Sequence, residues 1–294
     1  MKQSLSGRVF DIMNAVLMIV LAVICIYPMV YVLLSSVSNP SYLMMRSGVM
    51  LWPRGFTLEG YGLVFRNPNI LIAYRNTAVY LLTGTALQMV MTSIAAYVLS
   101  RKTFFFRNAL SLIIVFTMYF GGGMIPYYLT IKETLGMYNS LAAMIIPGAI
   151  STWNLIIMRT SFQSIPASLE ESASLDGASH LTILFRIIVP LSMPTMAVIT
   201  LYYAVGHWNS WFNALLFLRD RSRFPLQLIL REILITNQTI ELLDVTQVDQ
   251  MMKDDYRRLV QYCTIIVATV PILLAYPFLQ RFFVKGIMVG ALKG

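Results

Sequence analysis

The stretch EESASLDGASHLTILFRIIVPLSMP, from Glu170 to Pro194, decides how the rest of the chain is interpreted. Three acidic residues, Glu170, Glu171 and Asp176, fall within seven positions, and long apolar runs lie on both sides of them. Gly177 follows directly, and a glycine at such a place ends a helix because it adopts the left-handed conformation at little cost. The stretch therefore predicts a short helix, a sharp glycine corner and a second helix.

The residues around this corner carry further helix signals. Ser164 is a candidate N-cap of the first helix, with Pro166 close to its first helical position. Ser179 is a candidate N-cap of the second helix, which Pro190 is expected to stop. The second helix is amphipathic, since four apolar residues recur at helical spacing: Leu181, Leu184, Phe185 and Ile188.

The composition of the whole chain is that of an integral membrane protein. Of its 294 residues, 57% are hydrophobic and only 12% are charged, and the mean hydropathy is +0.69. The net charge of +9 comes from basic residues scattered between apolar runs, where they act as topology signals, so we expect no nucleic-acid partner. Cys25 and Cys263 both lie inside apolar runs, so we expect packing residues and no disulfide or metal site.

Six apolar stretches are long enough to cross a bilayer, which needs about 20 residues of helix. They cover residues 12–36, 76–100, 108–131, 139–158, 193–218 and 259–280. The first is too long for the apolar core of a cleaved signal peptide, so we expect it to be retained. The sequence thus predicts an all-α integral membrane fold with a single transmembrane domain over residues 1–294.

None of the six stretches contains Asp, Glu, Lys or Arg. Ion-coupled transporters usually keep such a group within the membrane, and the only titratable candidate here is His207, interpreted as a hydrogen-bonded interior histidine rather than a proton relay. A membrane-embedded enzyme is disfavoured for a similar reason, because the chain has no HExxH, no CxxC and no intramembrane carboxylate. We therefore expect no catalytic residues and no metal.

The connections between the spans suggest an orientation. With six spans, the long polar connections 37–75 and 219–258 fall on one side of the membrane. The basic segment RKTFFFR, the loop 161–195, both termini and the tail 281–294 fall on the other. Short basic stretches beside spans mark the cytoplasm, so the loop, the tail and both termini are expected there.

The stretch from Glu170 to Pro190 also resembles the EAA loop of bacterial ATP-driven importer permeases. That motif reads Glu, Ala, Ala, three residues, Gly, nine residues, Ile, one residue, Leu, Pro. The matching positions here are Glu171, Ser172, Ala173, Gly177, Ile187, Val189 and Pro190, of which Ser172 and Val189 depart from it slightly. Asp176 and Ala178 on either side of the glycine are usual in the carbohydrate branch. The resemblance extends through GGGMIPYYL, LGMYNSLAAMIIP, LIIMRTSF, HWNSWFNALLFL and FVKGIMVGALKG to nearly the whole chain.

This resemblance, closest to the smaller six-span permease of maltose-type systems, implies a type I ABC importer permease in the plasma membrane of a bacterium. Its cargo would be a carbohydrate, such as an oligosaccharide. Its partners would be a second permease, two cytoplasmic ATPase subunits, an extracytoplasmic solute-binding protein and membrane lipid. The chain has no GxxxxGK[ST] phosphate loop, so ATP and Mg²⁺ would bind to the ATPase subunits and this chain would carry no cofactor.

The same resemblance assigns a coupling role to the loop, in which the short helix lodges in a groove of an ATPase subunit. The implied coupling residues are Glu170, Glu171, Ala173, Asp176, Gly177, Ala178 and Pro190. The tail, with Lys285 and Lys293, would be either a second ATPase contact or a solvated end. The identity of the sugar stays open, as does the choice between a second copy of this chain and a different permease as partner.

A stripe on the fifth predicted span is a candidate substrate path. Tyr202, Gly206, Asn209 and Asn213 step by four, three and four, which places them on one face of a continuous helix, with Trp208 and Trp211 on either side. Amides and aromatic rings suit sugar hydroxyls and ring faces. Packing between helices is the alternative, and substrate contacts in the partner permease are another. Both stay open, as does the choice between gate and kink for the glycines at 121–123.

Overall fold

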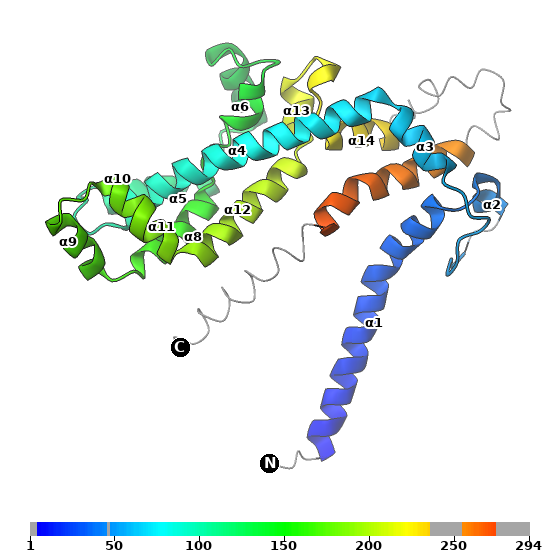
Figure 1. The fold of residues 1–294 in the computed structure, drawn as a ribbon, viewed down its shortest axis with the longest axis horizontal. Helices are drawn as coiled ribbons and strands as arrows, with labels where there is room; N and C mark the ends of the chain where they lie inside the picture. The colour runs from blue at the N-terminus through cyan, green and yellow to red at the C-terminus, as the bar shows by residue number, and fades with distance from the viewer. Residues whose placement is uncertain (1–4, 46–47, 236–254, 275–294) are drawn as a thin grey trace. The chain divides into compact units, whose positions relative to one another are not determined.

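The computed structural model describes residues 5–45, 48–235 and 255–274, and these are helical almost throughout (Figure 1). The α-helices up to residue 129 are α1 (Leu5–Ser36), α2 (Pro40–Met45), α3 (Glu59–Arg66), α4 (Pro68–Ser100), α5 (Arg107–Tyr119) and α6 (Met124–Leu129). Those after it are α7 (Leu141–Ile145), α8 (Thr152–Gln163), α9 (Ala167–Leu175), α10 (His180–Ile183), α11 (Val189–Leu191), α12 (Met193–Trp208), α13 (Phe212–Phe217) and α14 (Leu226–Ile235). Two π-helical turns, η1 (Thr130–Thr134) and η2 (Leu184–Ile188), and one 3-10 turn, η3 (Arg221–Arg223), complete them. Within the described ranges the β pairing is limited to one bridge, Ser38–Phe56.

Three described helices are long and apolar enough to cross a membrane: Gly7–Ser36, Pro68–Ser100 and Asp255–Leu274. Two bent helix pairs, Arg107–Tyr119 with Met124–Thr134 and His180–Leu191 with Met193–Trp208, raise the number to five if each pair is one span. The count of six therefore stays a prediction, and residues 275–280 of the last stretch lie outside the described residues.

Three of the predicted spans are not continuous helices. The stretch 108–131 bends by 113° between α5 and α6, so the glycines at 121–123 form a kink. The stretch 139–158 is divided into α7 and α8 at Pro147 and Gly148, because proline cannot donate the backbone hydrogen bond that continues a helix. The stretch 193–218 is divided into α12 and α13 at 209–211.

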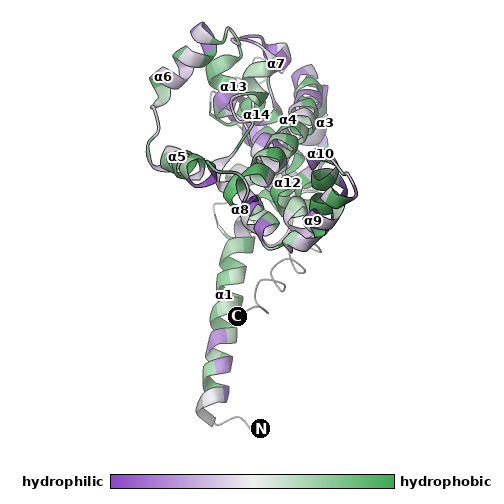
Figure 2. Cartoon of the chain, turned by 90° about the vertical axis from the view of Figure 1, so that its left-hand side faces the viewer, coloured by the Kyte–Doolittle hydropathy of each residue, from purple (hydrophilic) through white to green (hydrophobic). Residues whose placement is uncertain are grey.

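Contacts divide the described chain into two compact units. The first comprises Met1–Pro68 and Leu230–Pro271 and contains α1. Most residues of α1 are hydrophobic (Figure 2), and most of their side chains are exposed. Cys25 lies among these exposed residues, whereas Cys263 is buried. Cys263 donates from Sγ to the Ser36 carbonyl oxygen at 3.2 Å.

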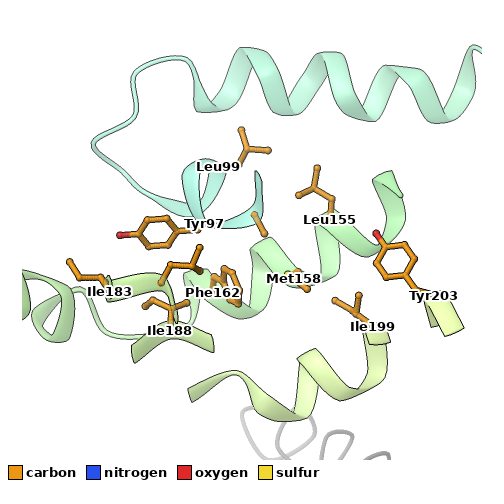
Figure 3. Close-up of a cluster of buried hydrophobic side chains, with 11 residues drawn as sticks. Tyr97, Leu99, Leu155, Met158, Phe162, Ile183, Ile188, Ile199 and Tyr203 are labelled. Carbon is orange, nitrogen blue, oxygen red and sulfur yellow. The ribbon is translucent and has the colours of Figure 1, made fainter. Parts of the chain in front are cut away.

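The second unit, Asn69–Ile229 with Ile272–Gly294, has its core around α4, α8 and α12. Buried side chains from these helices and from the α10 segment converge in one cluster (Figure 3), whose labelled members are Tyr97, Leu99, Leu155, Met158, Phe162, Ile183, Ile188, Ile199 and Tyr203. The buried face of α4 also carries polar groups that bond to other segments. Gln88 bonds to His207 of α12 and Thr92 bonds to Tyr203 of the same helix, while the buried Thr85 Oγ1 has no hydrogen-bond partner within the described part of the chain.

Gly84 brings α4 into close contact with α12. A Cβ at this position would lie 2.3 Å from Nε2 of His207, and that ring is buried and fixed by a 3.0 Å hydrogen bond to Gln88 Oε1. Moving the ring aside would break this hydrogen bond. A Cβ at residue 84 therefore has to displace the His207 ring or one of the two helices.

Gly84→Ala is accordingly expected to destabilise the protein by about 1–3 kcal/mol, the usual cost of overpacking a core. Gly62→Ala is the matched control, because Gly62 is also helical and a Cβ there meets nothing within 4 Å. Alanine favours a helix by about 0.5–1 kcal/mol over glycine, so Gly62→Ala should be neutral or stabilising. Thermal melting of the purified variants in detergent measures both, and equal melting midpoints would contradict the proposed close fit.

Candidate functional site

The loop after α8 folds into the predicted helix, glycine corner and second helix. α9 ends at Leu175, and Gly177 follows with φ +80°, the left-handed conformation. The Ala178 amide donates to the Ala173 carbonyl at 3.0 Å and the Gly177 amide donates to that of Ser174 at 3.1 Å, which closes the helix end. Ser179 Oγ accepts from the Thr182 amide at 3.3 Å and so caps α10, as the sequence predicted.

Two local expectations for this loop are wrong. Ser164 is the C-terminal cap of α8, and Pro166 takes the N-cap position of α9 in its place. Pro190 does not stop the second helix, which continues to Leu191 and bends by 91° into α12. The π-helical turn η2 directly before Pro190 explains this, because a widened turn accommodates a residue that has no amide hydrogen to donate.

Glu170 turns inward from α9 and pairs with the end of α4. Its Oε2 forms an ion pair with Arg101, and the two side chains are only 16% and 14% exposed. Its Oε1 accepts a 2.6 Å hydrogen bond from the Tyr97 hydroxyl. Arg101 also donates from Nη2 to the Phe162 carbonyl at 3.1 Å, and its guanidinium carbon lies 4.9 Å from the centre of the Tyr97 ring. We call Tyr97, Arg101 and Glu170 the α4–α9 latch.

The sequence did not identify Arg101 or Tyr97 as functional residues. Arg101 opens the basic segment RKTFFFR, which was interpreted as a topology signal alone. The partners in the ion pair are 69 positions apart. No periodicity or spacing connects them, so only the folded structure brings them together.

The other predicted coupling residues divide by the direction in which they face. Ala173 and Ala178 are partly buried and pack against the cluster shown in Figure 3. Glu171 and Asp176 are exposed, and the side chain of Leu175 between them is 89% exposed. A groove of about 570 Å³ runs beside α9, with charged and apolar residues in its wall: Arg101, Lys102, Phe162, Glu170, Glu171 and Leu175.

The stripe predicted on the fifth span does not form one helical face. α12 ends at Trp208, so Asn209 and Asn213 are not on the helix that carries Tyr202, and the expected single face is wrong. Tyr202, Gly206 and Asn213 nevertheless line the same cavity of about 330 Å³.

Asn209, Trp208 and Trp211 do not line this cavity. Asn209 is exposed at the end of α12. The Trp208 ring packs edge-on against Tyr74 with centroids 6.3 Å apart. Trp211 similarly packs against Phe212.

A hydrogen-bonded network forms the wall of the cavity. His207 Nε2 lies 3.0 Å from Gln88 Oε1, and Gln88 Nε2 donates to the Gly148 carbonyl at 2.8 Å. The Tyr203 hydroxyl lies 2.7 Å from Thr92 Oγ1 and accepts from the Ser151 amide at 3.1 Å. His207 is thus the hydrogen-bonded interior histidine that the sequence led us to expect. Asn154, which the sequence did not single out, also lines the cavity.

Two further expectations concern the tail and metal binding. Lys285 and Lys293 lie outside the described residues. Across the described ranges, His, Cys, Asp and Glu side chains form no group of three that could hold a metal ion.

Comparison with known proteins places the chain among transporter subunits. Residues 84–289 match the model of the family described as "Binding-protein-dependent transport system inner membrane component". The polygalacturonan/rhamnogalacturonan transport system permease protein YtcP of Bacillus subtilis (strain 168) is 37% identical over 99% of this chain and 100% of its own length. Protein LplC of the same organism is 39% identical over 100% of this chain and 98% of its own.

A solved structure shares the fold as well as the sequence pattern. It is a bacterial ABC transporter involved in the import of the acidic polysaccharide alginate, and one of its chains superimposes with a TM-score of 0.87. The sequence identity is 31%, over 96% of this chain and 99% of that one. The fold is therefore that of a type I importer permease, a transport component rather than an enzyme. On these grounds the chain belongs to the family of binding-protein-dependent transport system inner membrane components.

Proposed function

We propose that this permease imports a carbohydrate oligomer across the plasma membrane of a bacterium, as one of two permeases that enclose the path. The names of its relatives support this, since they include transporters of polygalacturonan/rhamnogalacturonan, arabinooligosaccharides and diacetylchitobiose. A solute-binding protein delivers the oligomer from outside. Two ATPase subunits bind ATP and Mg²⁺ and supply the driving force, while this chain binds no cofactor.

The coupling role is supported by the difference between the two sides of α9, of which one is bonded to α4 and the other is exposed. Glu170 holds the helix to α4 through the latch, while Glu171, Leu175 and Asp176 face away from the core. An 89% exposed leucine beside a carboxylate suits a partner groove that combines apolar area with a cation. We therefore assign the docking role to Glu171 and Leu175, and an internal holding role to Glu170, instead of one shared role for both glutamates.

The proposed orientation follows from this assignment. The loop 161–195 faces the cytoplasm, where the ATPase subunits lie, together with both termini and the tail 281–294. The connections 37–75 and 219–258 then face outward, toward the solute-binding protein. When ATP closes the ATPase pair, the α9 helices of the two permeases move together and the spans reorient as rigid bodies.

Glu171→Lys is expected to reduce copurification of the ATPase subunits by tenfold or more. Loss of a charge-assisted hydrogen bond costs about 1.5–3 kcal/mol, and each 1.4 kcal/mol is a factor of about ten in binding. Glu133→Lys is the matched control, because it makes the same charge change at a 62% exposed glutamate outside the loop. The amount of ATPase that copurifies with the tagged permease is measured by gel densitometry. ATP-driven uptake of galacturonate, alginate and arabinose oligomers is measured in vesicles that contain the complex, with the binding protein added.

Equal ATPase recovery from the Glu171→Lys and wild-type proteins would rule out Glu171 as a docking residue. Failure of the wild-type complex to take up any saccharide oligomer, with ATPases and binding protein present, would refute the carbohydrate assignment.

A further inference from the structure

The cavity of about 330 Å³ in the second unit contains a polar group that the fold itself does not satisfy. Asn154 is 5% exposed and lines the cavity. The hydrogen bond recorded for this residue within the described part of the chain is that of its backbone amide, which donates to Ser151 Oγ at 3.5 Å, and its side-chain amide has none. Because Asn154 lines an open cavity, its side-chain amide can bond to water there or to a ligand that takes the place of that water.

Gln88 and Tyr203, which line the same cavity, bond to other residues and not to the Asn154 side chain. Gln88 bonds to His207 and to the Gly148 carbonyl, and Tyr203 bonds to Thr92 and to the Ser151 amide. These bonds hold the wall in place around Asn154. A preformed wall with one unsatisfied amide is the usual arrangement of a small-molecule site, in which a few polar groups fix the ligand.

We propose that this cavity is a subsite for the hydroxyl groups of a saccharide unit as the oligomer passes through the permease. The proposal rests on the proposed function and assigns substrate contacts to this chain as well as to any partner. An amide both donates and accepts, and so does a sugar hydroxyl, so Asn154 can bond to one hydroxyl or bridge two neighbouring ones. Ser210 and the exposed ring of Tyr202 line the same cavity and extend the contact surface.

The size and charge of the cavity agree with this ligand. Its volume lies at the lower end of the roughly 300–1,000 Å³ found for small-molecule pockets, which suits one sugar unit rather than a whole oligomer. None of its described lining residues is Asp, Glu, Lys or Arg. Neutral hydrogen bonds to a passing chain are individually weak, which allows the substrate to leave as readily as it enters.

The test uses Asn154→Leu, which keeps the number and branching of the side-chain non-hydrogen atoms and removes the amide. If Asn154 serves packing alone, an apolar replacement of an unpaired buried amide should leave uptake unchanged. If it binds substrate, uptake falls by about threefold to tenfold, as expected for one neutral hydrogen bond, while the melting midpoint of the complex does not fall. Asn209→Leu is the matched control, because Asn209 is a nearby asparagine that lies outside the cavity wall.

The measurement is ATP-driven uptake by the complete complex in vesicles, with a labelled oligomer that the wild type transports. Binding-protein-stimulated ATP hydrolysis is recorded in parallel and should stay close to the wild-type rate. Uptake by Asn154→Leu equal to that of the wild type, or an equal loss in Asn209→Leu, would overturn the subsite. If the leucine variant does not assemble, Asn154→Ser is compared with Asn154→Ala, and the serine variant must transport faster. A wild-type complex that transports no saccharide would instead refute the proposed function.

Discussion

Replacing Arg101 with alanine is expected to reduce uptake by about tenfold or more while the apolar stretches stay inserted in the membrane. The change leaves the Glu170 carboxylate largely buried without its cation and removes the bond to the Phe162 carbonyl. Hydrogen bonds to charged groups contribute about 1.5–3 kcal/mol each, so α9 loses its charged link to the end of α4 and keeps the weaker hydrogen bond from Tyr97. If α9 moves without moving α4, the ATPase subunits hydrolyse ATP but no substrate is transported. The ratio of uptake to ATP hydrolysis is therefore the quantity to measure.

The adjacent cation provides the control for this prediction. Lys102 lines the same groove and is exposed, so Lys102→Ala removes an equal charge and should leave the coupling ratio close to the wild type. Combining Arg101→Ala with Glu170→Gln should restore part of the uptake, because no uncompensated carboxylate then remains buried. Normal coupling in Arg101→Ala, or a double variant with the full sum of both losses, would show that the latch does not transmit movement.

The sequence predicted the features of this protein that depend on neighbouring residues. The corner at Gly177 and the cap at Ser179 each need only a few adjacent positions, and both are confirmed. The helical fold and the transporter family follow from composition and from the loop motif, and both are confirmed by the comparisons. Signals within one turn of helix act through local sterics and hydrogen bonds, which tertiary packing seldom overrides.

Features that depend on distant residues were missed for a physical reason. Average hydropathy does not register a break such as that at Pro147, because an interrupted span stays as apolar as a continuous one. The predicted stripe through Asn209 is wrong because its three- and four-residue steps assume a continuous helix, and α12 in fact ends at Trp208. Asn154 lies in a predicted span and belongs to no recognisable sequence pattern. Its proposed role depends on the residues that line the cavity with it, such as Gln88, which is 66 positions away in the sequence.

Gly177→Val is expected to abolish most coupled uptake. Gly177 has φ +80°, and a residue with a Cβ pays roughly 1–2 kcal/mol in the left-handed region, with β-branched valine among the least tolerant. We expect the chain to relieve this strain by changing the angle between α9 and α10, which would move Glu171 and Leu175 away from their proposed docking positions. Uptake and ATPase copurification measure the loss, and protein recovered from the membrane fraction shows whether the variant is still inserted.

Gly177→Asn tests whether residue 177 must be glycine because of its left-handed backbone conformation or because a side chain there would collide with the ATPase. Asparagine adopts the left-handed conformation more readily than other residues with a Cβ, and a Cβ at Gly177 meets nothing within 4 Å in this chain. The asparagine variant should therefore keep most of its uptake if the backbone angle is what matters. If it fails as completely as valine, the glycine is needed because the ATPase groove approaches that backbone closely, and the corner is then part of the docking surface as well as a hinge. If both variants transport normally, the angle between α9 and α10 does not matter for coupling, and the lever assignment is wrong.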